Sequence, residues 1–381
     1  MSRKSLLLVV LVLSLLIPVA ADAEDGIANE PTTTYYRGVV REVGATLTED
    51  LGYGMILYKQ RIKVELLEGP FKGEIVTAEH HRGGRNAFDF QVRLRDRVLL
   101  LVELEDGAIS QAYIESIARD HLLLGLSIVF VLLLVAVGQV KGVKAALTLG
   151  LTILAVVKVL LPQMLLGRNP LWLAVAVAAS VTAFTLTVVS GFNRKTLTAI
   201  VGTTAGVVIA GFIAMKIGTI AALTGLSGEE AQMLLFIPQE VEFDFRGLLF
   251  AGMIIGALGA VMDVGMSISS AMEEVRRARP GISRGGLRQA GMNVGKDVMG
   301  TMSNTLILAY TGGAIPLLLL FLAYDIPLVR ILNMDLVATE VVRSLAGSIG
   351  LILTIPITAL VGSYLLQPEG ARARETGQAG R

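Results

Sequence analysis

The chain has 381 residues, of which 53% are hydrophobic and only 17% are charged, and its formal net charge is +1. Its mean hydropathy of +0.67 is too high for an ordinary soluble domain of this length. Because cysteine is absent, disulfide scaffolds and thiolate metal sites are excluded. A disordered chain is also excluded by the apolar content, and the near-neutral charge gives no support for nucleic-acid binding.

The first 23 residues have the layout of a secretory signal peptide. Arg3 and Lys4 precede an apolar run at 6–17, and the small residues Ala21 and Ala23 supply a cleavage site. The run is shorter than the roughly 20 residues that a spanning helix needs. We therefore expect cleavage near Ala23, with an uncleaved first helix as the alternative. In both cases the segment that follows is exported.

Residues 24–120 are polar and are expected to form an exported β domain. Strands are predicted at 35–48, 56–67, 74–78, 97–105 and 108–117. These predictions depend on alternating polar and apolar residues and on turns such as Asp106-Gly107. Five short strands fit a small barrel of the OB type, here with a docking or gating role. His80 and His81 are assigned to a loop, as solvated side chains rather than metal ligands.

After Asp120 the chain becomes strongly apolar, and seven membrane-spanning helices are predicted in the domain 121–366. They are placed at 121–139, 145–166, 170–191, 197–218, 247–272, 298–323 and 344–366. Each is long enough to cross a hydrocarbon core of roughly 30 Å. With the N-terminal domain outside the cell, seven spans put the tail at 367–381 in the cytoplasm.

The basic residues support this orientation. The segments expected inside the cell hold thirteen of them: Lys141, Lys144, Arg194, Lys195, Arg276, Arg277, Arg279, Arg284, Arg288, Lys296, Arg372, Arg374 and Arg381. The short outer loops hold four, Arg168, Arg246, Arg330 and Arg343, together with acidic residues such as Glu340. Because Lys and Arg gather on the cytoplasmic side of membrane proteins, the sequence predicts a multi-pass plasma-membrane protein with an extracytoplasmic N-terminal domain.

The fifth predicted span has a stripe of small and polar residues. Spacings of three and four put six residues on one helical face: Gly256, Gly259, Asp263, Ser267, Ser270 and Glu274. Asp263 is near mid-membrane, where a charged side chain costs at least about 2.5–3.5 kcal/mol on insertion scales. We therefore expect it to meet a partner, a bound cation or water, or to stay protonated. The functional interpretation is an ion or proton site, and the alternative is a helix-packing contact.

The sixth predicted span has a matching polar face. It includes Asp297, Thr301, Asn304 and Thr311. Asn304 is a candidate to hydrogen-bond Asp263 or to coordinate a cation with it. The expected substrate or ion path is therefore formed by Asp263, Asn304, Ser267, Ser270 and Thr301.

Two lysines are the other charges within predicted spans. Lys158 and Lys216 are expected to extend toward the outer surface, with Lys158 as an alternative counter-ion of Asp263. The seventh predicted span has Thr354 and Thr358 on one face and Pro356 within it, for which bending is the preferred interpretation.

Three runs resemble the YibE/F-like family of bacterial membrane proteins. They are residues 256–274, 296–310 and 342–350. The similarity extends over essentially the whole chain, including the exported β domain. The resemblance implies a multi-pass bacterial membrane protein, and it implies neither a substrate nor catalytic residues.

These features lead to the hypothesis of a membrane transporter or permease, with ion or proton coupling as an open option. The expected partners are the lipid bilayer and a small ion or solute. An extracytoplasmic protein that binds the exported domain is a further candidate partner. Oligomer formation and metal binding stay open, and no cofactor is expected. Neither a Walker A pattern nor a His-Glu-x-x-His motif is present, so an enzyme is the least expected class. The alternatives are a non-transporting scaffold or sensor and an ion channel.

Overall fold

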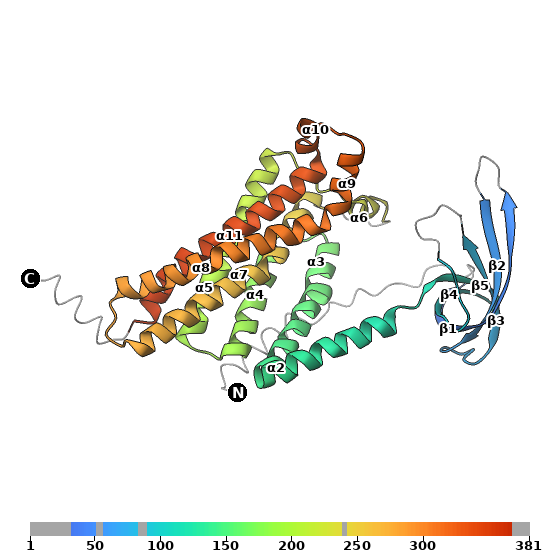
Figure 1. Cartoon of the computed structure of the whole chain (residues 1–381), viewed down its shortest axis with the longest axis horizontal. Helices are drawn as coiled ribbons and strands as arrows, with labels where there is room; N and C mark the ends of the chain where they lie inside the picture. Colours follow the sequence, from blue (N-terminus) through green and yellow to red (C-terminus); the bar gives the residue numbers. More distant parts are fainter. Residues whose placement is uncertain (1–31, 51–55, 83–89, 238–241, 368–381) are drawn as a thin grey trace, which may run out of the picture. The chain divides into compact units, whose positions relative to one another are not determined.

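The computed structural model describes residues 32–50, 56–82, 90–237 and 242–367. The chain divides into two compact units, and the boundary falls after Leu133, inside a long helix. The described part of the first unit is mainly a β-barrel, and that of the second is a helical bundle (Figure 1). The predicted signal peptide and all but Gln367 of the predicted tail lie outside the described residues.

The barrel has five strands, as predicted. They are β1 Thr32–Asp50, β2 Ile56–Leu66, β3 Ile75–Arg82, β4 Arg97–Glu105 and β5 Ala108–Ile117. The strand order is β1-β2-β3-β5-β4, and pairing of β1 with β4 closes the barrel. All neighbours are antiparallel except β3 and β5. Every second residue of β4 faces inward, so Val98, Leu100 and Val102 are fully buried.

The two adjacent histidines lie in β3, and their assignment to a loop is wrong. His80 is buried, its Nε2 is 2.9 Å from the carbonyl oxygen of Phe90, and its ring packs on the Phe90 ring at 4.7 Å. His81 lies on the outer face, 3.1 Å from the Glu79 carboxylate. The pair separates because successive side chains of a strand point to opposite faces.

The first helical element of the bundle is a bent 46-residue stretch. It consists of α2 Asp120–Ala155, the π-helix η1 Val156–Leu160 and α3 Leu161–Leu165. Gln139 interrupts α2 with φ 49° and ψ −128°, a conformation that residues other than glycine rarely adopt. The bend is sharp and brings the backbone of Gly142 against that of Leu134: a Cβ at Gly142 would overlap the Leu134 carbonyl. The predicted spans 121–139 and 145–166 therefore correspond to the two helical arms on either side of this kink.

The remaining elements form the packed bundle and its short connections. They are α4 Pro170–Ser190, α5 Arg194–Ile220, α6 Glu229–Met233, η2 Leu234–Phe236, α7 Phe245–Ala278, α8 Arg284–Gly313, α9 Ile315–Ala323, α10 Leu328–Leu332 and α11 Asp335–Leu365. Helix starts follow the sequence signals for capping: the side chains of Asn169, Asn193, Asp244 and Ser283 each accept a hydrogen bond from a backbone N–H three residues on.

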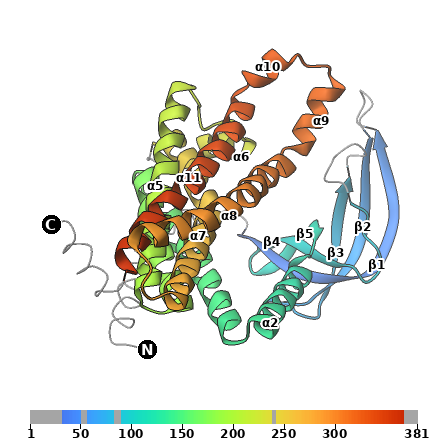
Figure 2. The same cartoon turned by 60° about the vertical axis from the view of Figure 1, so that its left-hand side comes forward.

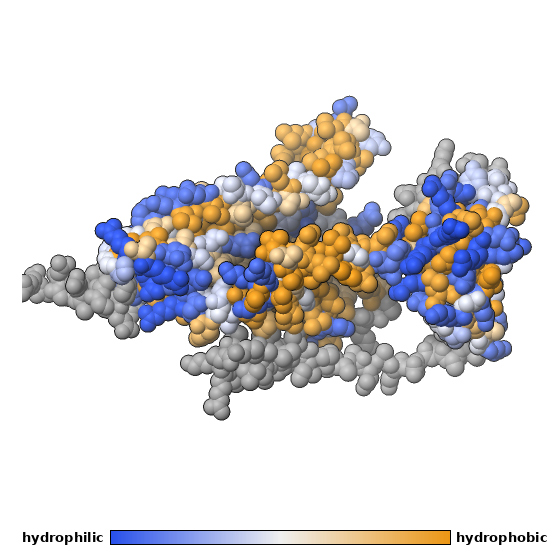
Figure 3. Space-filling model, turned by 60° about the horizontal axis from the view of Figure 1, so that its bottom comes forward, coloured by the Kyte–Doolittle hydropathy of each residue, from blue (hydrophilic) through white to orange (hydrophobic). Residues whose placement is uncertain are grey.

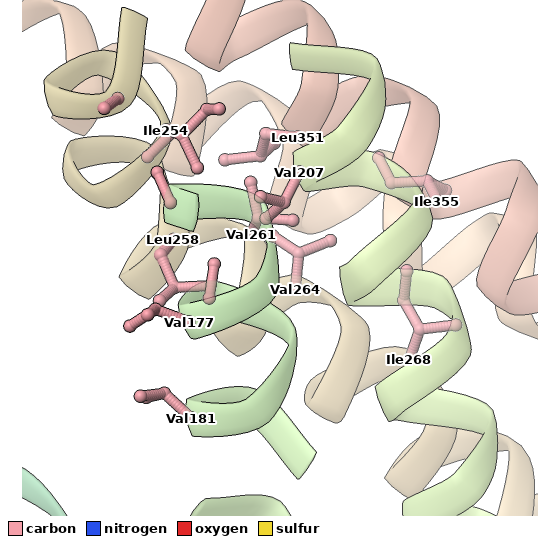
Figure 4. Packing of buried hydrophobic residues seen from close by; sticks show 14 of the residues in the cluster. Val177, Val181, Val207, Ile254, Leu258, Val261, Val264, Ile268, Leu351 and Ile355 are labelled. Atoms are coloured by element: carbon pink, nitrogen blue, oxygen red, sulfur yellow. The ribbon is translucent and has the colours of Figure 1, made fainter. Parts of the chain in front are cut away.

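The core of the bundle surrounds α7, which packs against α4, α5, α8 and α11. Val177 of α4, Val207 of α5, Val261 of α7 and Leu351 of α11 belong to one buried cluster (Figure 4). The buried side chains of α7 recur every three or four residues, as expected for one face of a helix. One side of α7 therefore carries the core, and the other side is available for other contacts.

Helices α5 and α11 approach each other especially closely. A Cβ at Gly202 would overlap the Thr358 side chain, and one at Gly206 would overlap that of Thr354. Small residues at such positions allow helix backbones to meet, which is how helices often associate in membranes. Thr354 and Thr358 are fully buried here and serve this packing.

The described residues contain five helices that are long and apolar enough to cross a membrane, or six if α8 and α9 are one broken span. The axes of α8 and α9 differ by 58°, and α9 turns away from α8 in Figure 2. The prediction of seven spans differs from this count by treating the two arms of 120–165, on either side of the kink at Gln139, as separate spans. Much of the outward surface is also hydrophobic, and hydrophilic residues gather at the end where α7 joins α8 (Figure 3). Such apolar helices indicate insertion into a membrane.

Candidate functional site

The predicted polar stripe of α7 lies on the side of this helix that faces away from the core. Gly259, Asp263 and Ser267 are exposed, and Ser270 is half-buried, whereas Val264 is fully buried. The helical spacing therefore predicted correctly that these residues share a face. The sequence could not show that this face is uncovered in the described chain, because that depends on how the helices of the bundle pack.

The polar residues of α8 are exposed in the same way. Thr301 and Asn304 lie outward, whereas Gly291 and Gly295 face the core. We call the uncovered residues of both helices together the polar face: Gly256, Gly259, Asp263 and Ser267 of α7, and Lys296, Asp297, Gly300, Thr301 and Asn304 of α8. The structure thus brings the predicted path residues to the surface of two neighbouring helices.

Three contacts fix the antiparallel register of α7 and α8. Gly291 lies against Met272, Gly295 lies against Ile268, and Gly256 lies against the hydroxyl of Tyr310. Counted from these contacts, Asp263 is level with Gly300 to Ser303, and Asn304 lies nearer to the Gly256 end. The predicted path residues of the two helices are therefore at similar heights.

Asp263 and Asn304 have no polar partner within the described part of the chain. Neither side chain makes a hydrogen bond or an ion pair there, so no direct bond joins them. The Thr301 hydroxyl is satisfied by the Val298 carbonyl of its own helix, at 2.9 Å. The possible counter-ion Lys158 is exposed in the π-helix η1 and forms no ion pair with Asp263. Two strongly polar side chains of the polar face are thus left free to meet a ligand, water or another protein.

A second feature is the space inside the bend between α8 and α9. Two adjoining cavities lie there, with volumes of about 350 and 420 Å³. Both are lined by Tyr310, Ala314, Leu317 and Glu340, and the larger one also by Arg343. We call them the bend cavities. Apolar walls with a few polar groups, at this size, are typical of sites for small ligands.

The polar groups of the bend cavities form a defined cluster. Arg343 Nη1 donates to Glu340 Oε1 at 2.7 Å, and the two side chains are 29% and 26% exposed. Sequence reasoning put both residues in an outer loop, but they lie in the first third of α11. Their spacing of three within one helix could have indicated an ion pair. Their meeting with Tyr310 could not be predicted, because it depends on how α8 packs against α11.

The bend cavities and the polar face adjoin each other. A Cβ at Gly256 would lie 2.6 Å from the Tyr310 hydroxyl, so this tyrosine contacts the end of the polar face. Tyr310 also lines both bend cavities. Tyr310 therefore lies between the Arg343–Glu340 pair and the Gly256 end of the polar face. Within the residues that the structure describes, no group of three or more His, Asp or Glu side chains is arranged to hold a metal ion.

Comparison with protein families identifies the chain. The model described as YibE/F-like protein matches residues 126–368. This chain belongs to the YibE/F-like family. The model of the YibE/F family N-terminal domain matches residues 40–117, so the two matches cover the helical part and most of the barrel of this YibE/F-like protein. No curated protein and no solved structure matches it.

The three runs that resemble the YibE/F-like family meet around one region of the bundle. Residues 256–274 hold Asp263, residues 296–310 hold Asn304 and Tyr310, and residues 342–350 hold Arg343. These residues belong to the polar face and to the bend cavities. The most recognisable parts of the sequence therefore coincide with the candidate site.

Proposed function

We propose that this YibE/F-like protein is a membrane transporter or permease for a small ion or solute. The observation that carries the proposal is Asp263, an exposed carboxylate in the middle of a long apolar helix. Facing lipid, its charge would cost at least about 2.5–3.5 kcal/mol, so it requires water, a bound cation or a protein partner. Charged residues within spans commonly mark ion pathways and proton relays.

The proposed path uses both parts of the candidate site. The bend cavities form its outer half, where Glu340 and Arg343 offer charges of both signs beside apolar walls. Asp263 and Asn304 form its middle, with Ser267, Ser270 and Thr301 along the wall. Coupling to an ion or a proton would act at Asp263, because it is the acidic group of the polar face nearest to the middle of a helix.

The proposed topology has seven spans, with the N-terminal domain outside and the C-terminus in the cytoplasm. At 1.5 Å per residue, the stretch from 120 to 165 is about 69 Å long, enough for two crossings joined at Gln139. Arg276, Arg277 and Arg279 at the end of α7 support a cytoplasmic location for the α7–α8 connection. A signal peptide at 1–23 would export the barrel.

The barrel is proposed to act as a docking or gating domain outside the cell. Its strand order, with β3 beside β5, supports a barrel of the OB type, which commonly binds ligands on an open face. The outer side of β1 and β2 has ion pairs such as Lys63–Glu42 and Arg41–Glu65. A mixed charged surface of this kind suits an extracytoplasmic protein partner better than a nucleic acid.

Flux measurements in proteoliposomes test the transport proposal. Wild type is compared with Asp263→Asn, using an internal pH-sensitive dye for protons and radiolabelled monovalent cations for ions. We expect flux of at least one of these in the wild type and a fall toward the protein-free background in Asp263→Asn. Glu274→Gln is the matched control, because Glu274 is an exposed carboxylate at the end of the same helix. Equal flux in wild type and Asp263→Asn would refute the assignment of the site.

The alternative is a scaffold or sensor that binds another protein. The observation in its favour is that Asp263 has no partner within the described chain and is free to contact a protein. In that case Asp263→Asn lowers the melting temperature in detergent, and the wild type has no flux to lose. An ion channel is distinguished by currents that do not saturate with ion concentration.

A further inference from the structure

We propose that a second copy of this chain covers the polar face, so that the path lies between two copies. The inference rests on the proposed function in one respect, because it takes α7 and α8 to cross a membrane. It adds a partner that the site needs: a single copy presents only one wall of the path.

The polar face is unsuited to lipid. Asp263 and Asn304 have no polar partner in the described chain, and both are exposed. Hydrocarbon offers neither hydrogen bonds nor counter-charges, so polar side chains in spans face protein or a water-filled cavity. The bundle covers the opposite side of α7 and leaves this one open. Another protein surface must therefore complete it.

The first arm of α2 is the least suitable cover. Between Leu122 and Gly138 the only polar side chain is Ser127, and its hydroxyl already donates to the Leu123 carbonyl at 2.8 Å. This arm offers Asp263 neither a donor nor a positive charge. The helices of the packed bundle are already engaged in its core. A second copy, in contrast, brings donors and a cation on its own polar face.

The polar face has the shape that close association requires. A Cβ at Gly252, Gly259 or Gly300 would meet nothing within 4 Å. These glycines occupy the outer surface of α7 and α8, so they do not serve packing within the copy. Small residues on a spanning helix allow another helix to approach closely.

The polar face has one cation, Lys296, and two carboxylates, Asp263 and Asp297, so a second copy offers Asp263 a counter-charge. By the register of α7 and α8, Lys296 is level with Ser267, four residues and about 6 Å along the helix from Asp263. An extended lysine side chain covers about this distance. In a two-fold dimer whose axis is perpendicular to the membrane plane, residues at similar depths in the membrane meet, and each contact occurs twice. Lys296 of each copy then reaches Asp263 of the other, whereas neither forms an ion pair within the described part of its own chain.

Cysteine cross-linking tests the inference directly, because the chain has no cysteine of its own. Gly259→Cys and Gly300→Cys are made separately in the full chain, reconstituted in liposomes and oxidised. Two cysteines can be linked only when their Cα atoms are about 4.4–6.8 Å apart. We expect a disulfide-linked dimer from at least one variant. Val208→Cys is the control: Val208 is an exposed residue midway along α5, outside the polar face, and the variant should stay monomeric.

A charge exchange provides the second measurement. Asp263→Lys and Lys296→Asp each place like charges opposite each other, and each should raise the dimer dissociation constant at least about tenfold. The double variant restores the pair and should recover the dimer, as measured by mass photometry in detergent or nanodiscs. Recovery in the double variant excludes misfolding as the cause of the single losses.

The outcomes separate this inference from the proposed function. A cross-linked dimer without ion or proton flux supports the two-copy interface and refutes transport. Flux from a protein that stays monomeric, with no disulfide formed in either the Gly259→Cys or the Gly300→Cys variant, refutes the two-copy interface and leaves transport standing. Equal linking in Val208→Cys would also refute the interface, because it would reflect random collision.

Discussion

The close contact between α5 and α11 makes a sharp prediction about Gly206→Ala. The added methyl would overlap the Thr354 side chain and would lie 3.0 Å from the Gly350 carbonyl oxygen. Thr354 is fully buried and its hydroxyl is held by that same carbonyl at 2.9 Å, so it has little room to move. Overpacking of a core costs about 1–3 kcal/mol, and alanine returns at most about 1 kcal/mol through its better helix propensity. We expect a net loss of roughly 1–2 kcal/mol.

Thermal unfolding in detergent measures this loss. A change of this size corresponds to a melting temperature lower by about 2–8 °C for a domain of this size. Thr354→Ala in the Gly206→Ala background should restore part of it by removing the hydroxyl. Gly150→Ala is the control, because a Cβ at Gly150 would meet nothing within 4 Å. A melting temperature that is unchanged or higher in Gly206→Ala would refute the close approach of α5 and α11.

Two further variants test the bend cavities and the barrel. Arg343→Met leaves Glu340 without its ion-pair partner and should lower the stability in detergent by about 0.2–1 kcal/mol, whereas Arg343→Lys keeps the charge and should lose less; equal losses would show that the charge is unimportant. His80→Leu leaves the partly buried Phe90 carbonyl without its partner and should cost about 1–3 kcal/mol by thermal unfolding of the full chain. His81→Leu, on the outer face, should change stability by less than about 0.5 kcal/mol, and a larger loss than in His80→Leu would contradict the strand assignment.

The sequence predicted the barrel well because its signals are local. Alternation with period two and the Asp106-Gly107 turn placed β4 and β5 at the observed residues. Strand β3 was predicted too short, because two histidines in a row resemble a polar loop. The burial of His80 depends on Phe90, which comes from outside the strand, so no local pattern could reveal it.

The helical part shows the same division between local and tertiary information. Hydropathy located the apolar stretches, but it could not show that the two arms of 120–165 meet in a sharp kink at Gln139. The break between α8 and α9 had a local signal in Gly312, Gly313 and Pro316, which the apolar content of 298–323 obscured. Periodicity put Asp263 on the correct helix face, but which face is covered depends on the packing of four other helices.

The contact between α5 and α11 also determines which parts of the bundle can change shape. Glycine and threonine interlock there without a gap, so the two helices can shift only together as one rigid body. The α8–α9 bend has the opposite character, because open volume lies on its inner side. A change in the angle between α8 and α9 would alter this volume and leave the α5–α11 contact intact. Because Glu340 and Val341 of α11 line these cavities, the rigid pair supplies their fixed wall, and α9 supplies the wall that can be displaced.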